Sequence, residues 1–261
     1  MLITLSPSKG QDFDVALPTA MHSQPRQLDD SQLLINELLK YDVPDIREMM
    51  KVSENIAILN VERFHTFERP FTLENAKPAL FAFKGDVYSG IQKDKYTEDD
   101  LAYAQDHLRI LSGLYGALRP MDLIQPYRLE MKTKLENPRG SNLYQFWGDR
   151  ITDSLNNDLE NQQEATLINL ASNEYFKSVK PKKLSGRLLQ IAFKETKNGK
   201  TRVIAIFAKR ARGMMTDFIL RNRIENSEDL KEFNEGGYEY SPSESNDKQW
   251  VFTRPQPVGK K

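Results

Sequence analysis

The sequence predicts an α/β protein, a mixed sheet surrounded by helices in a single domain, with α+β as the alternative class. Short runs of β-branched and aromatic residues alternate with segments of helical periodicity along the chain. The 261 residues are enough to bury a core, and 39% hydrophobic with 28% charged residues is typical of an ordinary globular protein. No internal repeat or long linker divides the chain. We therefore expect one domain over residues 1–254 and a flexible tail over 255–261.

Six apolar runs predict the strands of this sheet. They are residues 2–5 (LITL), 79–83 (ALFAF), 166–170 (TLINL), 188–193 (LLQIAF), 202–208 (RVIAIFA) and 249–253 (QWVFT). Asn198-Gly199, between the fourth and fifth runs, is a typical two-residue hairpin turn. We therefore expect those two strands to be antiparallel neighbours.

Helical periodicity predicts five helices around the sheet. The segments are 30–41, 97–111, 148–161, 213–224 and 226–233. Asp30 or Ser31 is the expected cap of the first helix. Thr97 is the expected cap of the second, whose first turn carries acids that suit the positive end of a helix.

The lack of cysteine and the scarcity of histidine exclude several kinds of site. Without cysteine the chain has no disulfide, thiolate nucleophile or iron–sulfur ligation of its own. The three histidines, His22, His65 and His107, are far apart in sequence, which argues against a zinc site. Carboxylate sites for magnesium or calcium remain open, but the sequence has no D-x-D-x-D-G loop, and we expect neither a metal nor a cofactor.

The sequence predicts neither a membrane helix nor a signal peptide. No apolar run approaches the roughly 20 residues that a membrane helix needs. The first ten residues lack a basic region and include Pro7. We expect a cytoplasmic protein without a membrane partner. The oligomeric state is open, and a monomer is compatible with the sequence.

The balanced net charge conceals a basic segment. Residues 1–176 hold 18 Lys or Arg against 27 Asp or Glu, whereas residues 177–212 hold 12 basic residues and one acid, Glu195. Because the basic residues flank apolar runs that predict strands, we expect them at strand ends and turns, where they converge on one face. Such a face indicates a polyanionic partner. The alternative is an ordinary solvated basic surface.

Small, polar or cationic residues follow four of the predicted strands. Ligands of open α/β sheets collect at the carboxyl ends of the strands, so these segments predict a shared cleft. The alternative is that strands simply end in polar turns. The four segments are Ser6–Gly10, Lys84–Tyr88, Ala171–Tyr175 and Lys209–Gly213.

The last of these segments, KRARG, predicts a phosphate site. A strand that leads through a basic turn into a helix would direct free N–H groups and the positive helix end to one point. Lys209, Arg210 and Arg212 would add charge, and Gly213 would allow close approach. The segment is not a Walker A loop, so nucleoside triphosphate hydrolysis is not supported.

The stretch LRILSGLYGALRPMD predicts a helix–hairpin–helix element within residues 97–130. Gly113 and Gly116 interrupt a helical pattern, and Pro120 suits the first turn of a second helix. A glycine turn of this kind approaches a DNA phosphate without side chains in the way. The alternative is a plain turn between helices.

Several motifs together resemble the YaaA family of bacterial peroxide-stress-resistance proteins. They are LSPSKG, FKGDVYSG, DHLRILSGLYGALRPMDLIQPYRLEM, NLYQFWGD, INLASNEYFKSVKPKKL and FAKRARGMM, and the resemblance runs from Met1 to about Arg254. Ser8 and Gly10 stand where the family has alanine and threonine, which leaves Lys9 in place.

The resemblance implies an α/β fold of unusual topology with a positively charged cleft and a helix–hairpin–helix. It also implies binding to duplex or branched DNA, and a role in limiting peroxide damage that is linked to lower free iron. Carried over to this chain, the hairpin is Ser112, Gly113, Leu114, Tyr115 and Gly116. The cleft candidates are Lys9, Lys84, Arg128, Lys177, Lys180, Lys182, Lys183, Lys209, Arg210 and Arg212.

Two other functions compete with DNA binding. An enzyme could act on a nucleotide, base or phosphorylated metabolite in the cleft, with Asp86, Tyr88, Asn173, Glu174 and Tyr175 in acid–base or positioning roles. Against this, Glu174 could simply pair with a neighbouring lysine. A metal-handling protein is the weakest alternative, because only scattered histidines and carboxylates are available as ligands.

Overall fold

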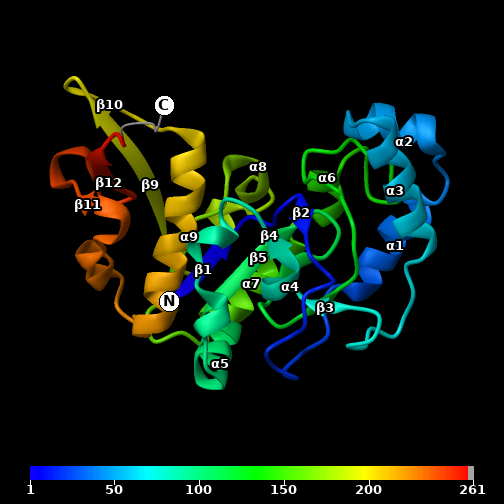
Figure 1. Cartoon of the computed structure of the whole chain (residues 1–261), viewed down its shortest axis with the longest axis horizontal. Coiled ribbons are helices and arrows are strands. Elements are labelled where there is room, and N and C mark those ends of the chain that lie inside the picture. Colours follow the sequence, from blue (N-terminus) through cyan, green and yellow to red (C-terminus); the bar gives the residue numbers. More distant parts are fainter. Residues whose placement is uncertain (258–261) are drawn as a thin grey trace.

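A mixed sheet of eight strands runs through the centre of the computed structural model, which describes residues 1–257 (Figure 1). Its strands are β1 (Leu2–Leu5), β5 (Leu108–Ser112), β6 (Gly116–Leu118), β8 (Thr166–Asn169), β9 (Arg187–Lys197), β10 (Lys200–Arg202), β11 (Glu239–Tyr240) and β12 (Gln249–Pro255). The order is β11-β12-β9-β8-β1-β5-β6, with β10 paired to β9. The strands from β12 to β5 are parallel, and β6, β10 and β11 pair antiparallel with their neighbours.

Helices cover both faces of the sheet and extend one side of the molecule. The longer ones are α1 (Leu28–Leu38), α2 (Val43–Met50), α3 (Glu54–His65), α5 (Glu98–His107), α7 (Arg150–Leu159) and α9 (Ala205–Asn222), and the short ones are α4 (Ala79–Ala82), α6 (Leu143–Trp147) and α8 (Asn173–Phe176). In Figure 1, α1–α3 form one flank, β9–β12 with α9 form the other, and α8 lies between them. No helix in the described part of the chain is long and apolar enough to cross a bilayer.

Short elements connect these parts. Two small antiparallel pairs join β2 (Gly10–Gln11) to β4 (Phe83–Lys84) and β3 (Lys77–Pro78) to β7 (Leu123–Ile124). The 3₁₀ turns are η1 (Tyr88–Gly90), η2 (Lys93–Lys95), η3 (Pro181–Lys183), η4 (Ser227–Glu232), η5 (Glu235–Gly237) and η6 (Pro242–Glu244).

Four of the six predicted strands are confirmed as β1, β8, β9 and β12. Residues of β1 and β8 are all buried, as expected for central parallel strands with helices on both faces. The predicted turn is confirmed as well: Asn198 and Gly199 have φ of 52° and 71°, and they join β9 to antiparallel β10.

The prediction for residues 79–83 is wrong, because Ala79–Ala82 form α4 and only Phe83 enters a strand. All four residues of α4 are buried. A fully buried apolar run has no periodicity that separates a strand from a helix, so packing decided this segment.

The prediction for residues 202–208 is also wrong, because α9 begins at Ala205. Lys209, Arg210 and Arg212 therefore lie inside a helix, where backbone N–H groups are bonded to carbonyls four residues back. The KRARG segment does not form a phosphate loop. A Cβ on Gly213 would stand 1.8 Å from the carbonyl oxygen of Val87, so this glycine admits neighbouring protein backbone.

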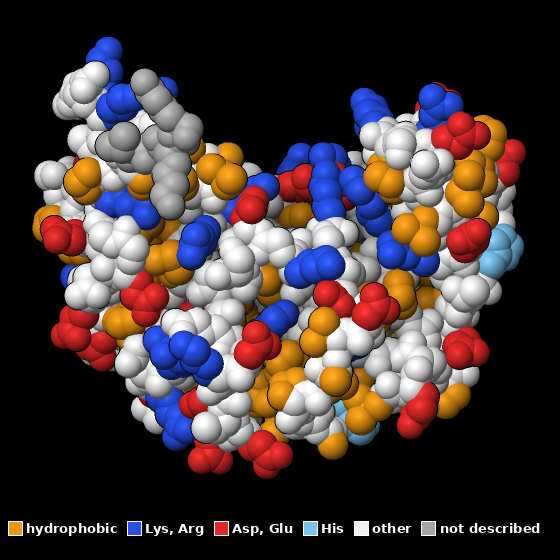
Figure 2. Space-filling model, viewed as in Figure 1, with side chains coloured by type: hydrophobic (Ala, Val, Ile, Leu, Met, Phe, Trp, Pro, Cys, Tyr) orange, Lys and Arg blue, Asp and Glu red, His pale blue; other side chains and the backbone are white. Residues whose placement is uncertain are grey.

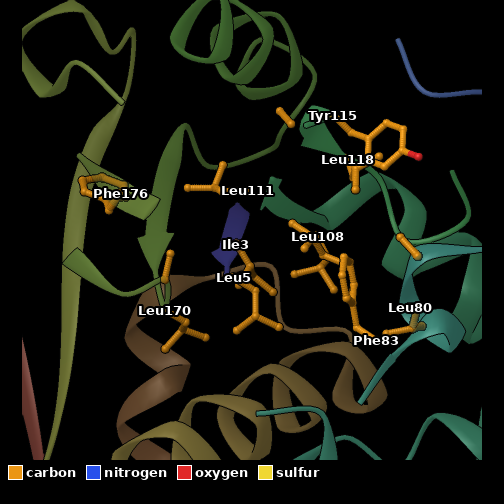
Figure 3. Packing of buried hydrophobic residues seen from close by; sticks show 14 of the residues in the cluster. Ile3, Leu5, Leu80, Phe83, Leu108, Leu111, Tyr115, Leu118, Leu170 and Phe176 are labelled. Carbon is orange, nitrogen blue, oxygen red and sulfur yellow. The ribbon is translucent and has the colours of Figure 1, made fainter. Parts of the chain in front are cut away.

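The predicted helix–hairpin–helix is not formed within residues 97–130, all of which the structure describes. Helix α5 ends at His107, and β5 and β6 follow as an antiparallel hairpin that belongs to the central sheet. Figure 3 shows Leu108 of this hairpin on the same face of the sheet as Ile3 and Leu5 of β1, and Leu111 on the opposite face.

The turn Ser112–Gly116 is buried throughout. A Cβ on Gly113 would stand 2.2 Å from the carbonyl oxygen of Leu129, and one on Gly116 would stand 2.0 Å from Oε1 of Gln27. Gly116 also has φ of 70°, which L side chains rarely adopt. The two glycines therefore admit neighbouring parts of the protein, and a DNA phosphate has no access to this turn.

The remaining helix predictions differ in their boundaries. The first helix starts at Leu28, so neither Asp30 nor Ser31 caps it. Thr97 forms the predicted cap of α5, as a capping box with Asp100. The predicted helix 148–161 is α7, that at 213–224 is the second half of α9, and that at 226–233 is the 3₁₀ turn η4.

Helices α2 and α3 were not predicted, and the end of the chain differs from its prediction. Sequence periodicity did not indicate α2 and α3, although Asp42 and Asp45 form a capping box at the start of α2. The predicted tail begins with Pro255, which is still part of β12, and the N–H of Gln256 donates to Thr196. Residues 258–261 lie outside the described residues.

Candidate functional site

The central strands β1 and β8 create a crevice at their carboxyl ends. The two strands are adjacent and parallel. From β1 the chain continues in the sheet to β5 on one side of this pair, and from β8 it continues to β9 on the other side. The carboxyl end of such a switch point is where open α/β sheets bind ligands. The backbone N–H of Ser172 donates to Oγ of Ser6 at 2.8 Å, which joins the two loops that leave these strands.

A pocket of about 680 Å³ occupies this crevice, and we name it the inner pocket. All four segments that the sequence predicted to converge contribute to its wall, so their convergence is confirmed, although two of them do not follow strands of the central sheet. The lining residues are Ser6, Pro7, Ser8, Lys9, Gly85, Asp86, Val87, Glu130, Lys132, Ser172, Asn173, Glu174, Tyr175, Lys209 and Arg212.

A second pocket of about 520 Å³, the outer pocket, continues from the inner one toward α2. The two share Lys9, Glu130 and Lys132, and together they form what we call the basic cleft. Figure 2 shows a hollow between the two flanks, with Lys and Arg side chains gathered in it. The cations that line the cleft are Lys9, Lys51, Arg128, Lys132, Lys134, Lys209 and Arg212, and the carboxylates are Glu48, Asp86, Glu130 and Glu174.

Glu130 organises the centre of the cleft. Its carboxylate lies 2.9 Å from Nζ of Lys9, 3.0 Å from Nζ of Lys132 and 3.1 Å from Nη2 of Arg128. Burial opposes ionisation of Glu130, but hydrogen bonds from Lys9 and Lys132 outweigh it and lower the pKa of this carboxyl group. One anionic side chain thus holds three cations at the junction of the two pockets.

Glu174 is the second carboxylate of the inner pocket, and it pairs with a lysine as the simpler alternative predicted. Its Oε2 lies 3.5 Å from Nζ of Lys132. Its Oε1 is enclosed and accepts no hydrogen bond from any described residue. Tyr144 donates its hydroxyl to the backbone oxygen of Glu174 at 2.8 Å, which fixes α8 against α6. Burial raises the pKa of the neighbouring Tyr175 hydroxyl, so it stays protonated.

Helix α9 supplies the opposite wall of the inner pocket. Nζ of Lys209 lies 3.7 Å from Oδ2 of Asp86. Arg212, one turn further on, lines the pocket, and burial lowers the pKa of its guanidinium. Tyr88 lies behind the wall and is buried, with its hydroxyl donating to the backbone oxygen of Ser6 at 3.1 Å. Asp86 and Asn173 line the pocket, whereas Tyr88 does not.

Several predicted cleft residues lie elsewhere. Lys84 pairs with Asp12 at 3.4 Å, Lys177 lies 5.0 Å from the ring centre of Tyr144, and Lys183 pairs with Asp149 at 2.6 Å. These residues, with Lys180 and Lys182, do not line the basic cleft, and Arg210 lines a separate pocket. Only Lys209 and Arg212 of the basic segment 177–212 line the cleft. The segment thus supplies two of the seven cations of the cleft, and its other basic residues do not line it.

Sequence reasoning missed Glu130 and Lys132, the central pair of the cleft. A signal was present in the stretch YRLEMKTK, where charged residues occupy alternate positions and Leu129, Met131 and Thr133 between them are buried. Extended backbone places alternate residues on one face, so this pattern indicates a charged, solvent-facing edge. Its partners in the loops after β1 and β8 were not visible from the pattern.

Two further observations describe the surroundings of the cleft. Helices α2 and α3 form a pair joined by a short turn in which Lys51 has φ of 51°, and Met49, Met50 and Lys51 line the outer pocket. Among residues 1–257 the structure places no group of three or more His, Asp or Glu that could hold a metal ion.

The matches to known proteins extend over the residues that line both pockets. The sequence profile described as peroxide stress protein YaaA matches residues 1–244. A UPF0246 protein of Cellvibrio japonicus (strain Ueda107) is 50% identical over 258 residues, 99% of this chain and 100% of that protein. One from Aliivibrio fischeri (strain MJ11) is 54% identical over 254 residues, covering 97% and 98% of the two chains. One from Acaryochloris marina (strain MBIC 11017) is 52% identical over 254 residues, covering 97% and 100%.

Proposed function

We propose, for a chain that belongs to the peroxide stress protein YaaA family, that it binds duplex or branched DNA through phosphates, without base specificity, during the peroxide-stress response. The observation that carries this proposal is the basic cleft. Seven lysine or arginine side chains from separate parts of the chain line it, against four carboxylates. Clustered cations of this kind supply the electrostatic part of DNA binding.

The central cations are available to a phosphate. Lys9 and Lys132 pair with Glu130, but the lysine side chains themselves are exposed. Arg128 also pairs with Glu130, so it can keep this buried carboxylate paired while the exposed ammonium groups of the lysines turn toward a phosphate.

Both flanks offer cations to a strand that lies in the hollow. The β9–β10 hairpin carries Lys197, Lys200 and Arg202, all exposed, and α2 ends at Lys51 on the opposite flank (Figure 1). DNA in the hollow would therefore meet positive charge on the floor and on each side. The buried turn Ser112–Gly116 has no part in this proposal.

DNA binding of this kind connects directly to damage by iron and peroxide. Cations that neutralise phosphates displace the counterions condensed on DNA. Ferrous iron bound at phosphates is one such counterion, so protein bound along DNA would lower the amount of iron that reacts with peroxide at its surface. This protection needs no thiol, and the chain contains no cysteine.

Fluorescence anisotropy of labelled duplex and four-way-junction DNA over a range of salt tests the proposal. We expect the logarithm of the association constant to fall linearly with the logarithm of the salt concentration. The slope should be about −0.9 for each phosphate neutralised. Lys9→Ala/Lys132→Ala should bind more weakly and reduce the slope by about 2. Lys40→Ala/Lys95→Ala removes the same charge from exposed positions outside the cleft and is the matched control. Affinity that is independent of salt, or equal losses in both variants, would contradict the proposal.

An enzyme that acts on a nucleotide, base or phosphorylated small molecule is the second candidate. The observation in its favour is Glu174, a carboxylate in the inner pocket that could move a proton while the cations position a phosphate. Incubation with nucleotides and with DNA, followed by chromatography, tests it. A product that the wild type forms and Glu174→Gln does not form would support catalysis.

A further inference from the structure

We propose that the inner pocket receives a single nucleotide extruded from bound DNA, with its phosphate at the mouth and an amine-bearing base inside. This inference rests on the proposed DNA binding and names what the inner pocket recognises. Three observations carry it: two carboxylates that lie beneath two exposed lysines, the size and walls of the pocket, and exposed aliphatic side chains beside it.

On one side of the inner pocket, two carboxylates lie deeper than the lysines with which they pair, whereas beside α9 Asp86 is exposed and Arg212 is partly buried. The side chains of Lys9 and Lys132 are 60% and 62% exposed, whereas those of Glu130 and Glu174 are 11% and 26% exposed. A simple phosphate ligand needs cations and has no use for acceptors beneath them. A nucleotide needs both, because its phosphate is anionic and the amines of adenine, guanine and cytosine donate hydrogen bonds. The lining therefore fits a nucleotide better than a bare phosphate.

The dimensions and walls of the pocket suit one nucleotide. Its volume of about 680 Å³ lies within the roughly 300–1,000 Å³ of pockets that enclose small ligands. Tyr175 lines it and offers an aromatic side chain of the kind on which bases stack. Proteins that read or modify one base of a duplex turn the nucleotide out of the stack into such a pocket.

Exposed aliphatic side chains lie next to the cationic wall. Val203 and Ile206 are 56% and 58% exposed, and they lie three residues apart in the chain, just before the cations of α9. Ile206 precedes Lys209 by three residues on α9, so the two side chains are neighbours on the helix surface beside the inner pocket. Aliphatic side chains in this position insert between base steps and unstack them, which fills the space that an extruded nucleotide leaves. They would have no role in binding a free nucleotide, which favours DNA as its source.

Duplex DNA with one 2-aminopurine, whose fluorescence rises when it leaves the stack, tests the inference. Fluorescence and anisotropy are measured together, at protein concentrations that saturate each variant. We expect the fluorescence to rise on binding of the wild type. Ile206→Ser should lose this rise, and Val15→Ser, which changes another highly exposed aliphatic residue, should keep it. Glu174→Gln should reduce the rise, because it removes the negative charge and replaces one of the two acceptor oxygens with a donor, which weakens the hydrogen bond from the base amine.

The possible failures are distinguishable. Salt-dependent anisotropy without any rise in fluorescence would overturn the extruded nucleotide and leave the DNA-binding proposal standing. A rise that Ile206→Ser and Glu174→Gln both retain would also overturn it. Calorimetric binding of adenosine 5′-monophosphate that Glu174→Gln weakens, with no fluorescence rise on DNA, would show that the pocket takes a free nucleotide. The absence of DNA binding altogether would overturn both proposals.

Discussion

The turn Ser112–Gly116 and the inner pocket illustrate two ways in which glycine and small polar residues follow a strand. In the turn, Oγ of Ser112 accepts the N–H groups of Leu114 and Tyr115 at 3.2 and 3.0 Å, and the segment contains no cation. At the inner pocket, exposed lysines accompany the small residues. Glycine shows that something approaches the backbone closely. A phosphate can approach such a backbone only where free hydrogen-bond donors and exposed positive charge are present. The turn Ser112–Gly116 lacks both, so the neighbouring group is another part of the protein.

The largest effect should come from filling the space beside the buried turn. Gly113→Val places side-chain atoms on the carbonyl of Leu129, so we expect a loss of about 2–4 kcal/mol in the free energy of unfolding. Urea denaturation measures it. Gly199→Ala is the control, because nothing lies within 4 Å of its Cβ and only left-handed backbone strain, about 1–2 kcal/mol, is expected. If Gly113→Val kept normal stability but failed to bind DNA, the turn, rather than the cleft, would be the part that contacts DNA.

A smaller effect should define how far the DNA path extends along the cleft. Lys134 is exposed and lines only the outer pocket. If DNA occupies both pockets, Lys134→Ala should bind more weakly and reduce the salt slope by about 1, whereas Lys95→Ala should not. Anisotropy titrations over a range of salt provide the slope. An unchanged slope for Lys134→Ala would confine the DNA to the inner pocket.

A still smaller effect should appear in the dependence of stability on pH. The pKa of Glu130 is lowered in the folded protein, so its ionised form stabilises the fold above the pKa of the unfolded chain. This contribution is lost as the pH falls through the folded value. We expect Glu130→Gln to lose less stability than the wild type between pH 7 and pH 3, with a difference below about 1 kcal/mol because the partner lysines are exposed. Parallel urea titrations at the two pH values would refute this if both proteins lost the same amount.

The smallest effect is expected from cations of the basic segment that lie outside the cleft. Lys182→Ala/Lys183→Ala removes two positive charges, as Lys9→Ala/Lys132→Ala does, but neither residue lines the cleft. We expect the salt slope to remain that of the wild type in anisotropy titrations. A reduction as large as that of the cleft variant would mean that total charge, rather than the cleft, determines binding.

Local signals in the sequence were sufficient for much of the sheet and insufficient for two segments of the site. The runs that became β1 and β8 and the Asn198-Gly199 turn have strong local preferences that agree with the fold. The strand predicted at residues 202–208 was wrong. By composition, a β-branched run next to basic residues suits a strand, but packing against η1 and β9 favours the helix α9. The cleft was predicted in outline from the four polar segments. Lys9 and Arg128 of its central group were among the candidates, but Glu130 and Lys132 were missed, because their meeting with the distant Lys9 depends on the fold.

The sequence by itself determined the strands β1 and β8, the β9–β10 turn, the cap of α5 and the polar segments that surround the inner pocket. These features depend on residues within one or two turns of each other, so composition and spacing carry them. Only the tertiary structure decided that Gly113 faces the backbone of Leu129 and that Lys9, Glu130 and Glu174 meet at one switch point. Burial and long-range pairing follow from the order of strands in the sheet, and no local pattern contains that order.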